Sequence, residues 1–163
     1  MNQSNLSPQE REAPRTHLIL IITPIIFAII SILDGQVLNW STQLNNLVPL
    51  YVRIILCIIF GIVALVLIQI SHKTLFKNHK LPDTLMTNGI FEYVRNPMYL
   101  GILLIYFAVI CFSISLISLC VFIVIFIVYD KMVKFEEEIL EKIFGNEFLE
   151  YKKKVPRWIP KFF

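Results

Sequence analysis

Long apolar runs separated by shorter polar stretches dominate this chain. Residues 18–33 and 47–70 are each long enough to predict a membrane-spanning helix, and Pro24 interrupts the first, where we expect a kink. Residues 98–129 are almost wholly apolar, which is too long for one ordinary span and tight for two. Serines at 113, 115 and 118 favour a turn within this run, so we predict a hairpin of two spans, roughly 97–112 and 115–133.

The polar stretches predict the remaining organisation. Residues 1–16 read as a polar tail, 34–46 as a loop and 71–96 as a polar connection. Residues 130–154 continue as a charged amphipathic helix that leaves the membrane; Gly145 fits a helix C-cap, and a short helix over 146–154 ends before Pro156. We therefore predict an all-α integral membrane protein with about four spans, forming one membrane domain over residues 17–163.

Composition and charge support this class and give it an orientation. The chain is 56% hydrophobic with a mean hydropathy of +0.70, above the apolar share of an ordinary soluble domain. Lys and Arg gather in 71–96 and 130–163 and are absent from 34–46, so the positive-inside rule predicts a multi-pass protein with both termini in the cytoplasm. The two basic segments would then face each other at one membrane surface. The scattered His and Cys residues predict no metal site, and we expect no nucleic-acid partner.

The first candidate site is the start of the helix predicted from residue 97. Asn96 is a good N-cap residue and Pro97 is favoured at the first helical position. The first-turn amides and the helix dipole favour an anion, and Arg95 adds a positive charge, so a carboxylate or phosphate could bind there. The alternative is that Arg95 anchors the helix to lipid headgroups.

The second candidate site lies on the helix predicted over 131–145. Helical periodicity places Glu136 and Glu137 beside an apolar face, and Glu138 on the opposite face with lysines. Inward carboxylates are costly unless a partner satisfies them. That partner could be a ligand, or Arg95 or Arg157 in a purely structural ion pair.

These two segments resemble the motifs of a known family, the isoprenylcysteine carboxyl methyltransferases and related phospholipid methyltransferases. The first is similar to the family's Gly-x-Tyr-x-x-Val-Arg-His-Pro-x-Tyr-x-Gly motif, and the second resembles a later family motif. The matching stretches are Gly89-x-Phe-x-x-Val-Arg-Asn-Pro-Met-Tyr-Leu-Gly101 and Glu136-Glu137-x-x-Leu140-x-x-x-Phe144-Gly145-x-x-Phe148-x-x-Tyr151-x-x-x-Val155-Pro156-Arg157.

The resemblance implies a membrane methyltransferase that uses S-adenosyl-L-methionine and has no Rossmann domain, in agreement with the absence of a glycine-rich fingerprint. The cofactor is expected at the cytoplasmic surface, between segments 71–101 and 130–160. Glu137 is the expected proton acceptor where the methyl acceptor needs one, and Arg157 either binds an anionic acceptor or holds the C-terminal tail. The expected cofactor-binding residues are Asp83, Thr84, Leu85, Met86, Phe91, Arg95, Asn96, Pro97, Met98, Tyr99 and Glu136.

Three departures from the family pattern bear on the acceptor. Asn96 replaces the usual His and cannot titrate, Phe91 replaces the usual Tyr, and Met132 stands where many relatives carry a substrate-binding Arg. The expected acceptor is lipophilic and enters from the bilayer among membrane lipids; prenylated-protein carboxylates, phospholipid amines and small isoprenoid-like acids or phenols all remain open. A membrane reductase of related helical core and a non-catalytic membrane scaffold remain as alternatives.

Overall fold

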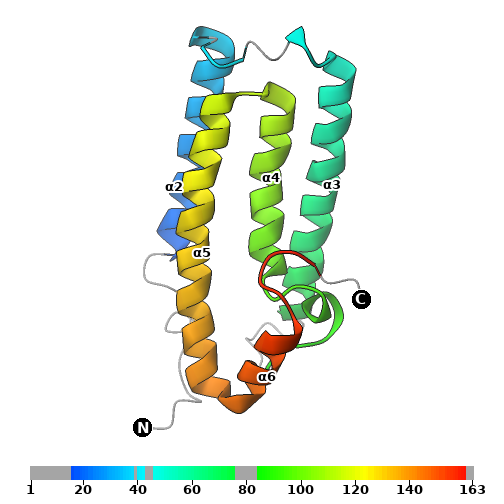
Figure 1. Ribbon diagram of the computed structural model, residues 1–163, viewed down its shortest axis with the longest axis vertical. Coiled ribbons are helices and arrows are strands. Elements are labelled where there is room, and N and C mark those ends of the chain that lie inside the picture. Colours follow the sequence, from blue (N-terminus) through cyan, green and yellow to red (C-terminus); the bar gives the residue numbers. More distant parts are fainter. Residues whose placement is uncertain (1–15, 39, 43–45, 76–83, 161–163) are drawn as a thin grey trace.

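The computed structural model describes residues 16–38, 40–42, 46–75 and 84–160, and this part of the chain is helical without a β-strand. Four helices of this part of the chain, α2 to α5, run side by side along one axis, and a shorter helix follows the last of them (Figure 1). The elements in chain order are α2 (Thr16–Ile32), the π-helical turn η2 (Leu33–Leu38), α3 (Leu50–Leu75), the 3₁₀ turn η4 (Gly89–Glu92), α4 (Pro97–Ser113), α5 (Leu116–Phe144) and α6 (Asn146–Lys154).

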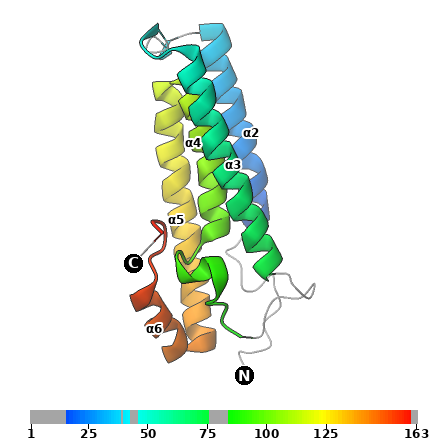
Figure 2. The same cartoon turned by 90° about the vertical axis from the view of Figure 1, so that its right-hand side faces the viewer.

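The helices pack as two pairs joined in the middle. α3 lies along α4, α2 lies along α5, and α4 also contacts α5 (Figures 1 and 2). The start of α2, the end of α3, the start of α4 and α6 all lie at one end of the bundle. The described parts of the two basic segments therefore lie at the same end of the bundle, and their place at a membrane surface stays a prediction.

A close approach between α3 and α4 explains the last glycine of the first motif. A Cβ added to Gly101 would lie 2.9 Å from the backbone oxygen of Ala64 and 2.7 Å from a side-chain carbon of Ile68. Ala64 is itself fully buried at this contact. Gly101 is thus needed for the two helices to pack this closely.

Among the described residues, three helices are long and apolar enough to cross a membrane: the one spanning Thr16–Gly35, α3 and α5. Much of the outward surface of α2 and α3 is exposed isoleucine, leucine and valine, as a lipid-facing surface would be. α4 is apolar but has only 17 residues. By length and composition, the described helices thus include three candidate membrane spans and one shorter apolar helix.

The hairpin between α4 and α5 forms where the serines predicted it. Ile114 adopts a left-handed conformation (φ 43°), and the Ser115 hydroxyl caps α5 by accepting a hydrogen bond from the Ser118 amide at 2.9 Å. α5 then runs unbroken to Phe144, so the span and the amphipathic helix expected after it are one helix. Gly145 (φ 55°, ψ −126°) makes the turn into α6, a conformation that favours glycine, and α6 covers the predicted 146–154.

Some predicted boundaries were wrong. The expected loop at 34–46 begins as the π-helical turn of η2, and α3 extends through Leu75 into the expected polar connection. α2 is one helix on both sides of Pro24, and the kink expected there stays a prediction. The tail at residues 1–15 lies outside the described residues.

Candidate functional site

The start of α4 is built differently from the expected cap. Pro97 is the first helical residue, as predicted, and Asn96 holds the N-cap position. However, the Asn96 side chain makes no capping hydrogen bond; its amide nitrogen donates to Oε1 of Glu137 at 3.1 Å. The first-turn amides therefore receive no acceptor from the N-cap side chain, which keeps this positive helix end suited to an anionic ligand group.

Glu137 is the centre of an ion-pair network that joins three segments. Its side chain is only 2% exposed. Arg95, just before α4, donates from Nε to Oε1 at 3.0 Å, and Arg157, after α6, donates from Nη2 to Oε2 at 2.8 Å. Two guanidinium groups and one amide thus satisfy both carboxylate oxygens of Glu137.

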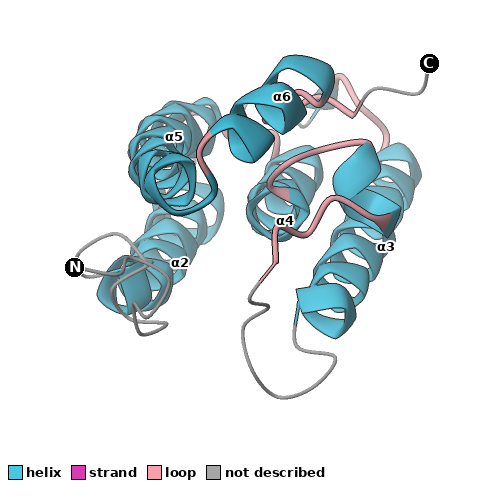
Figure 3. Cartoon of the chain, turned by 90° about the horizontal axis from the view of Figure 1, so that it is seen from below, coloured by secondary structure: helices cyan, strands magenta, loops and turns pink. Residues whose placement is uncertain are grey.

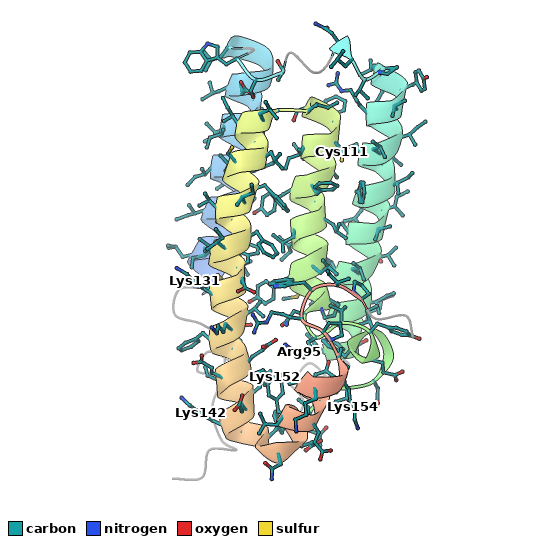
Figure 4. The ribbon with its side chains drawn as sticks, viewed as in Figure 1. Arg95, Cys111, Lys131, Lys142, Lys152 and Lys154 are labelled. Atoms are coloured by element: carbon teal, nitrogen blue, oxygen red, sulfur yellow. The ribbon has the colours of Figure 1, made fainter. Side chains whose placement is uncertain are left out.

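The two arginines also fix the C-terminal segment. Arg95 Nη1 donates to the carbonyl oxygens of Lys152 and Val155, each at 2.8 Å, and Arg157 Nη1 donates to Asp130 at 2.9 Å. Hydrogen bonding to Glu137 raises the pKa of Arg157 above its ordinary value, so its guanidinium stays charged. Figure 4 shows Arg95 in the lower part of the molecule, within the space enclosed by α5, α6 and η4.

This geometry bears on three expected roles. The Glu137 oxygens accept hydrogen bonds from two arginines, which makes Glu137 a poor proton acceptor. Arg157 donates hydrogen bonds to Glu137 and Asp130, contacts that agree with the second of its two expected roles, holding the C-terminal tail, which stays a prediction. The structural ion-pair alternative therefore describes Glu137, Arg95 and Arg157, and Arg95 is buried in the protein rather than placed among lipid headgroups.

Glu136 and Glu138 lie as helical periodicity predicted. Glu136 is half-buried and accepts a hydrogen bond from the Tyr99 hydroxyl at 2.7 Å, whereas Glu138 is exposed. Lys131 and Lys142 point outward from α5 (Figure 4). Neighbouring glutamates of one helix thus have separate roles: Glu137 holds the fold and Glu136 faces the space between α4 and α5.

A cavity of about 460 Å³ lies at this end of the bundle. The lining residues come from the starts of α2 and α4, the end of α3, and the segment 84–91. The C-terminal part of α5 and the helix α6 complete the lining. The described lining residues are Thr16, His17, Leu20, His72, Leu75, Thr84, Leu85, Met86, Phe91, Arg95, Asn96, Pro97, Met98, Tyr99, Glu136, Glu137, Leu140, Phe144, Phe148 and Tyr151.

The cavity brings together most of the residues singled out from the sequence. Every expected cofactor-binding residue within the described part of the chain lines it; Asp83 lies outside that part. Glu137 lines it as well, and Arg157 lies behind Glu137. Met132, the third departure from the family pattern, is a buried core residue beside Tyr99 and Tyr129, so it leaves no cation at that position.

Sequence reasoning missed two groups of lining residues. Leu140, Phe144, Phe148 and Tyr151 belong to the second motif, and that membership was the available signal. Those supplied by α2 and α3 carried no local signal, because only the packing of distant helices brings them to the cavity.

The lining suits a ligand with an aromatic part and several polar groups. Aromatic rings come from η4 and from the α5–α6 turn, and Phe148 is 1% exposed. The Tyr151 hydroxyl donates to the Phe91 carbonyl at 2.7 Å, and burial raises its pKa above the ordinary value, so it stays a neutral donor. Glu136 offers a carboxylate to a cation or hydroxyl, and the start of α4 offers amides to an anion.

Together these features define a helical membrane protein with a mixed polar and aromatic cavity at one end of its bundle. The chain belongs to the phospholipid methyltransferase family, whose model matches residues 50–147, more than half of the sequence. A methyltransferase family implies a methyl donor, and the match includes α3, α4 and all of α5.

Two curated relatives resemble the same part of the chain. One is protein-S-isoprenylcysteine O-methyltransferase B of Arabidopsis thaliana, 30% identical over 87 residues, covering 52% of this chain and 41% of the relative. The other is protein-S-isoprenylcysteine O-methyltransferase of Schizosaccharomyces pombe, 32% identical over 91 residues, covering 55% of this chain and 38% of the relative. The matches thus span about two fifths of the length of these relatives.

Proposed function

We propose that this protein is an S-adenosyl-L-methionine-dependent methyltransferase whose acceptor is a lipophilic molecule of the bilayer, either an isoprenylcysteine-type carboxylate or a phospholipid amine. The observation that carries the proposal is the cavity, because residues from two motifs far apart in the sequence line one space at the end of a membrane bundle. The family and the names of the relatives supply the reaction class.

The cavity offers a complementary group to each part of the proposed cofactor. The amides at the start of α4 suit its carboxylate, Glu136 suits its ammonium or ribose hydroxyls, and the ring of Phe91 suits its adenine. When bound, S-adenosyl-L-methionine supplies an activated methyl group on a positively charged sulfur.

The residues of the chain then bind, orient and exclude water. The network around Glu137 fixes α4, α5 and the C-terminal segment relative to one another, so the walls of the cavity are preorganised. The aromatic residues of α5 and α6 exclude water from one side. We place this site, and both termini of a multi-pass protein, on the cytoplasmic side, since the described lysines and arginines other than Arg53 gather at that end.

The test is binding of radiolabelled S-adenosyl-L-methionine to the full chain purified in detergent. We expect saturable binding, and in Glu136→Ala a dissociation constant raised roughly tenfold, because a hydrogen bond to a charged group is lost. Glu138→Ala is the matched control: it removes an exposed carboxylate two residues away and should leave the affinity unchanged.

Three results would contradict the proposal. Absence of saturable binding, or unchanged affinity in Glu136→Ala, would remove its basis. NADPH binding would favour the reductase alternative. Cofactor binding without methyl transfer to any fraction of a membrane lipid extract would favour the non-catalytic scaffold.

A further inference from the structure

We propose that α6 and the residues after it form a docking surface for the headgroups of anionic phospholipids in the surrounding bilayer. The surface consists of two exposed lysines, Lys153 and Lys154, followed by Trp158 and the exposed Ile159. This inference goes beyond the proposed function, because it concerns the outer side of α6 and not the cavity that α6 lines with its inner side.

Three consecutive lysines end α6, and the structure divides them into two kinds. Lys152 lies against α5, because its Nζ is 3.3 Å from Oε2 of Glu141. Lys153 and Lys154 are both exposed, and within the described part of the chain neither forms an ion pair with a carboxylate. Figure 4 shows Lys154 on the side of α6 that is turned away from α5. Two cations of the run are therefore presented outward.

These two lysines lie level with the start of the apolar helix α4. Arg95, just before α4, donates from Nη1 to the carbonyl oxygens of Lys152 and Val155, each at 2.8 Å. The two carbonyls flank Lys153 and Lys154 in the chain, so these hydrogen bonds hold the pair of lysines beside the segment that leads into α4. Lipid headgroups lie just outside the apolar part of a membrane helix, and lysine side chains near that boundary reach them.

The chain after α6 returns along α5 toward its apolar part. Trp158 donates from Nε1 to Oδ1 of Asp130 at 2.8 Å, and its ring packs on Phe126 with ring centroids 5.4 Å apart. Phe126 belongs to the apolar stretch of α5 and is partly exposed, as a ring beside lipid would be. Ile159, next to Trp158, is 80% exposed. Because tryptophan is typical of the boundary between headgroups and acyl chains, we infer that this segment lies at that boundary.

The order of groups along this surface matches the order of groups in a leaflet. The exposed carboxylates of α6, Glu147 and Glu150, precede its lysines, so charge along the helix changes from negative to positive toward the level of α4 (Figure 1). The indole and Ile159 follow, nearer to the apolar stretch of α5. Lysine attracts a lipid phosphate, and an indole and an isoleucine suit the adjoining acyl carbons. An anionic phospholipid meets both requirements in one molecule.

The surface is distinct from the cavity. Seen from below, α6 lies at the edge of the bundle, across α4 from the nearer ends of α2 and α3 (Figure 3). Phe148 and Tyr151, on the inner side of α6, line the cavity, whereas Lys153 and Lys154 do not. A lipid bound on the outer side of α6 therefore occupies a different place from a ligand of the cavity, and the two can be measured separately.

The experiment uses Trp158 as a reporter in the full chain. The sequence has two tryptophans, and Trp40 is exposed at the other end of the bundle, so Trp40→Phe leaves Trp158 as the single indole. This protein is placed in phosphatidylcholine bilayers that contain a minor share of brominated phosphatidylglycerol or, in a parallel sample, of brominated phosphatidylcholine with the same acyl chains. Bromine quenches the fluorescence of a nearby indole, so the two samples compare how strongly each lipid binds beside Trp158. We expect phosphatidylglycerol to be preferred by roughly tenfold or more, because each lysine near an anionic surface contributes a factor of about five.

Variants of the lysines test the assignment. In Lys153→Gln/Lys154→Gln we expect the preference to fall to within about twofold of equal binding, since both charges are lost. Lys142→Gln is the matched control: it removes an exposed lysine from the last turn of α5, away from Trp158, and should change the preference by less than about twofold. An unchanged Trp158 emission spectrum without brominated lipid shows that each variant keeps this segment in place.

A further variant tests the apolar half of the surface. Ile159→Ser removes the exposed isoleucine and keeps both lysines, so it should weaken quenching by the two lipids to a similar extent. The ratio between the two lipids should stay within about twofold of its value before this change. A loss of the preference itself in Ile159→Ser would contradict the assignment of headgroup recognition to the lysines.

Three results would overturn the inference. The first is equal quenching by the two lipids in the Trp40→Phe protein, which would leave the lysines only to complement the negative end of the α6 dipole. The second is an unchanged preference in the double lysine variant, and the third is an equal loss of preference in Lys142→Gln. None of these measurements involves S-adenosyl-L-methionine or methyl transfer, so failure of this inference and failure of the proposed function are distinguishable.

Discussion

The two ends of the bundle bury a carboxylate in opposite ways. At the end distant from the cavity, Asp34 is 2% exposed, like Glu137 near the cavity. Asp34 accepts hydrogen bonds from the hydroxyls of Ser41 and Ser115, both at 2.5 Å, and from the Ser41 amide at 3.2 Å. Glu137 accepts hydrogen bonds from two guanidinium groups.

The difference shows what each network holds. The Asp34 network ties the segment after α2 to the N-cap of α5 with short neutral donors, and the described part of the cavity does not include it. The Glu137 network joins three segments through two long cationic side chains, and its members line the cavity or lie behind it. Asp34 thus joins the segment after α2 to the α4–α5 hairpin, whereas Glu137 joins the segments beside the cavity.

The largest effect should come from breaking the Glu137 network. Glu137→Ala leaves two guanidinium groups without their carboxylate, one of them almost buried, so we expect a loss of about 3–5 kcal/mol in the free energy of unfolding. The measurement is thermal unfolding in detergent followed by circular dichroism.

The control for this change is Glu138→Ala, which alters an exposed residue of the same helix. It should shift the free energy of unfolding by less than about 0.5 kcal/mol. Equal stability of the two variants would contradict the structural role of Glu137.

A smaller effect is expected at the other end. Asp34→Ala removes the acceptor of two serine hydroxyls and one amide, which should cost about 1–3 kcal/mol. Because Asp34 does not line the cavity, the dissociation constant of S-adenosyl-L-methionine should remain unchanged in the folded variant. A weakened affinity for S-adenosyl-L-methionine would contradict this expectation, because it would show that the two ends of the bundle are coupled.

The smallest effect concerns the C-terminal segment beside the Glu137 network. Trp158 donates from Nε1 to Asp130 at 2.8 Å and packs on Phe126 with ring centroids 5.4 Å apart. Trp158→Phe keeps a ring and removes the donor, so it should cost about 0.5–1.5 kcal/mol. Thermal unfolding measures this loss, and a loss as large as that of Glu137→Ala would mean that the ring packing, rather than the hydrogen bond, fixes the segment.

Much of the helical order could be predicted because it depends on local signals. Apolar runs marked the long helices, Pro97 and Ser115 marked helix starts, and Gly145 marked the turn before α6. The continuation of the last span as a charged helix was also expected, because the backbone hydrogen bonds of a helix do not depend on a change from apolar to charged residues. The π-helical turn after α2 had no recognised signature in the sequence.

The site was predictable only along its motifs. Periodicity placed Glu136 and Glu137 inward, and the motif resemblance selected residues that do line the cavity. The convergence of Arg95 and Arg157 on Glu137 appeared only as one of several alternatives, since helix faces do not specify partners 42 and 20 residues away. The lining residues of α2 and α3 were not predicted, because their helices meet the cavity only through tertiary packing.

The shortness of α4 has a consequence for the depth of the cavity. Its 17 residues measure about 26 Å, less than the roughly 30 Å thickness of a typical hydrocarbon core. Such a hydrophobic mismatch is relieved when lipids beside a short helix thin the bilayer or when polar helix ends sink toward the acyl chains. We therefore expect the cavity at the start of α4 to lie level with the outermost acyl carbons, where a lipid-borne acceptor can present its head while its tail stays dissolved in the membrane.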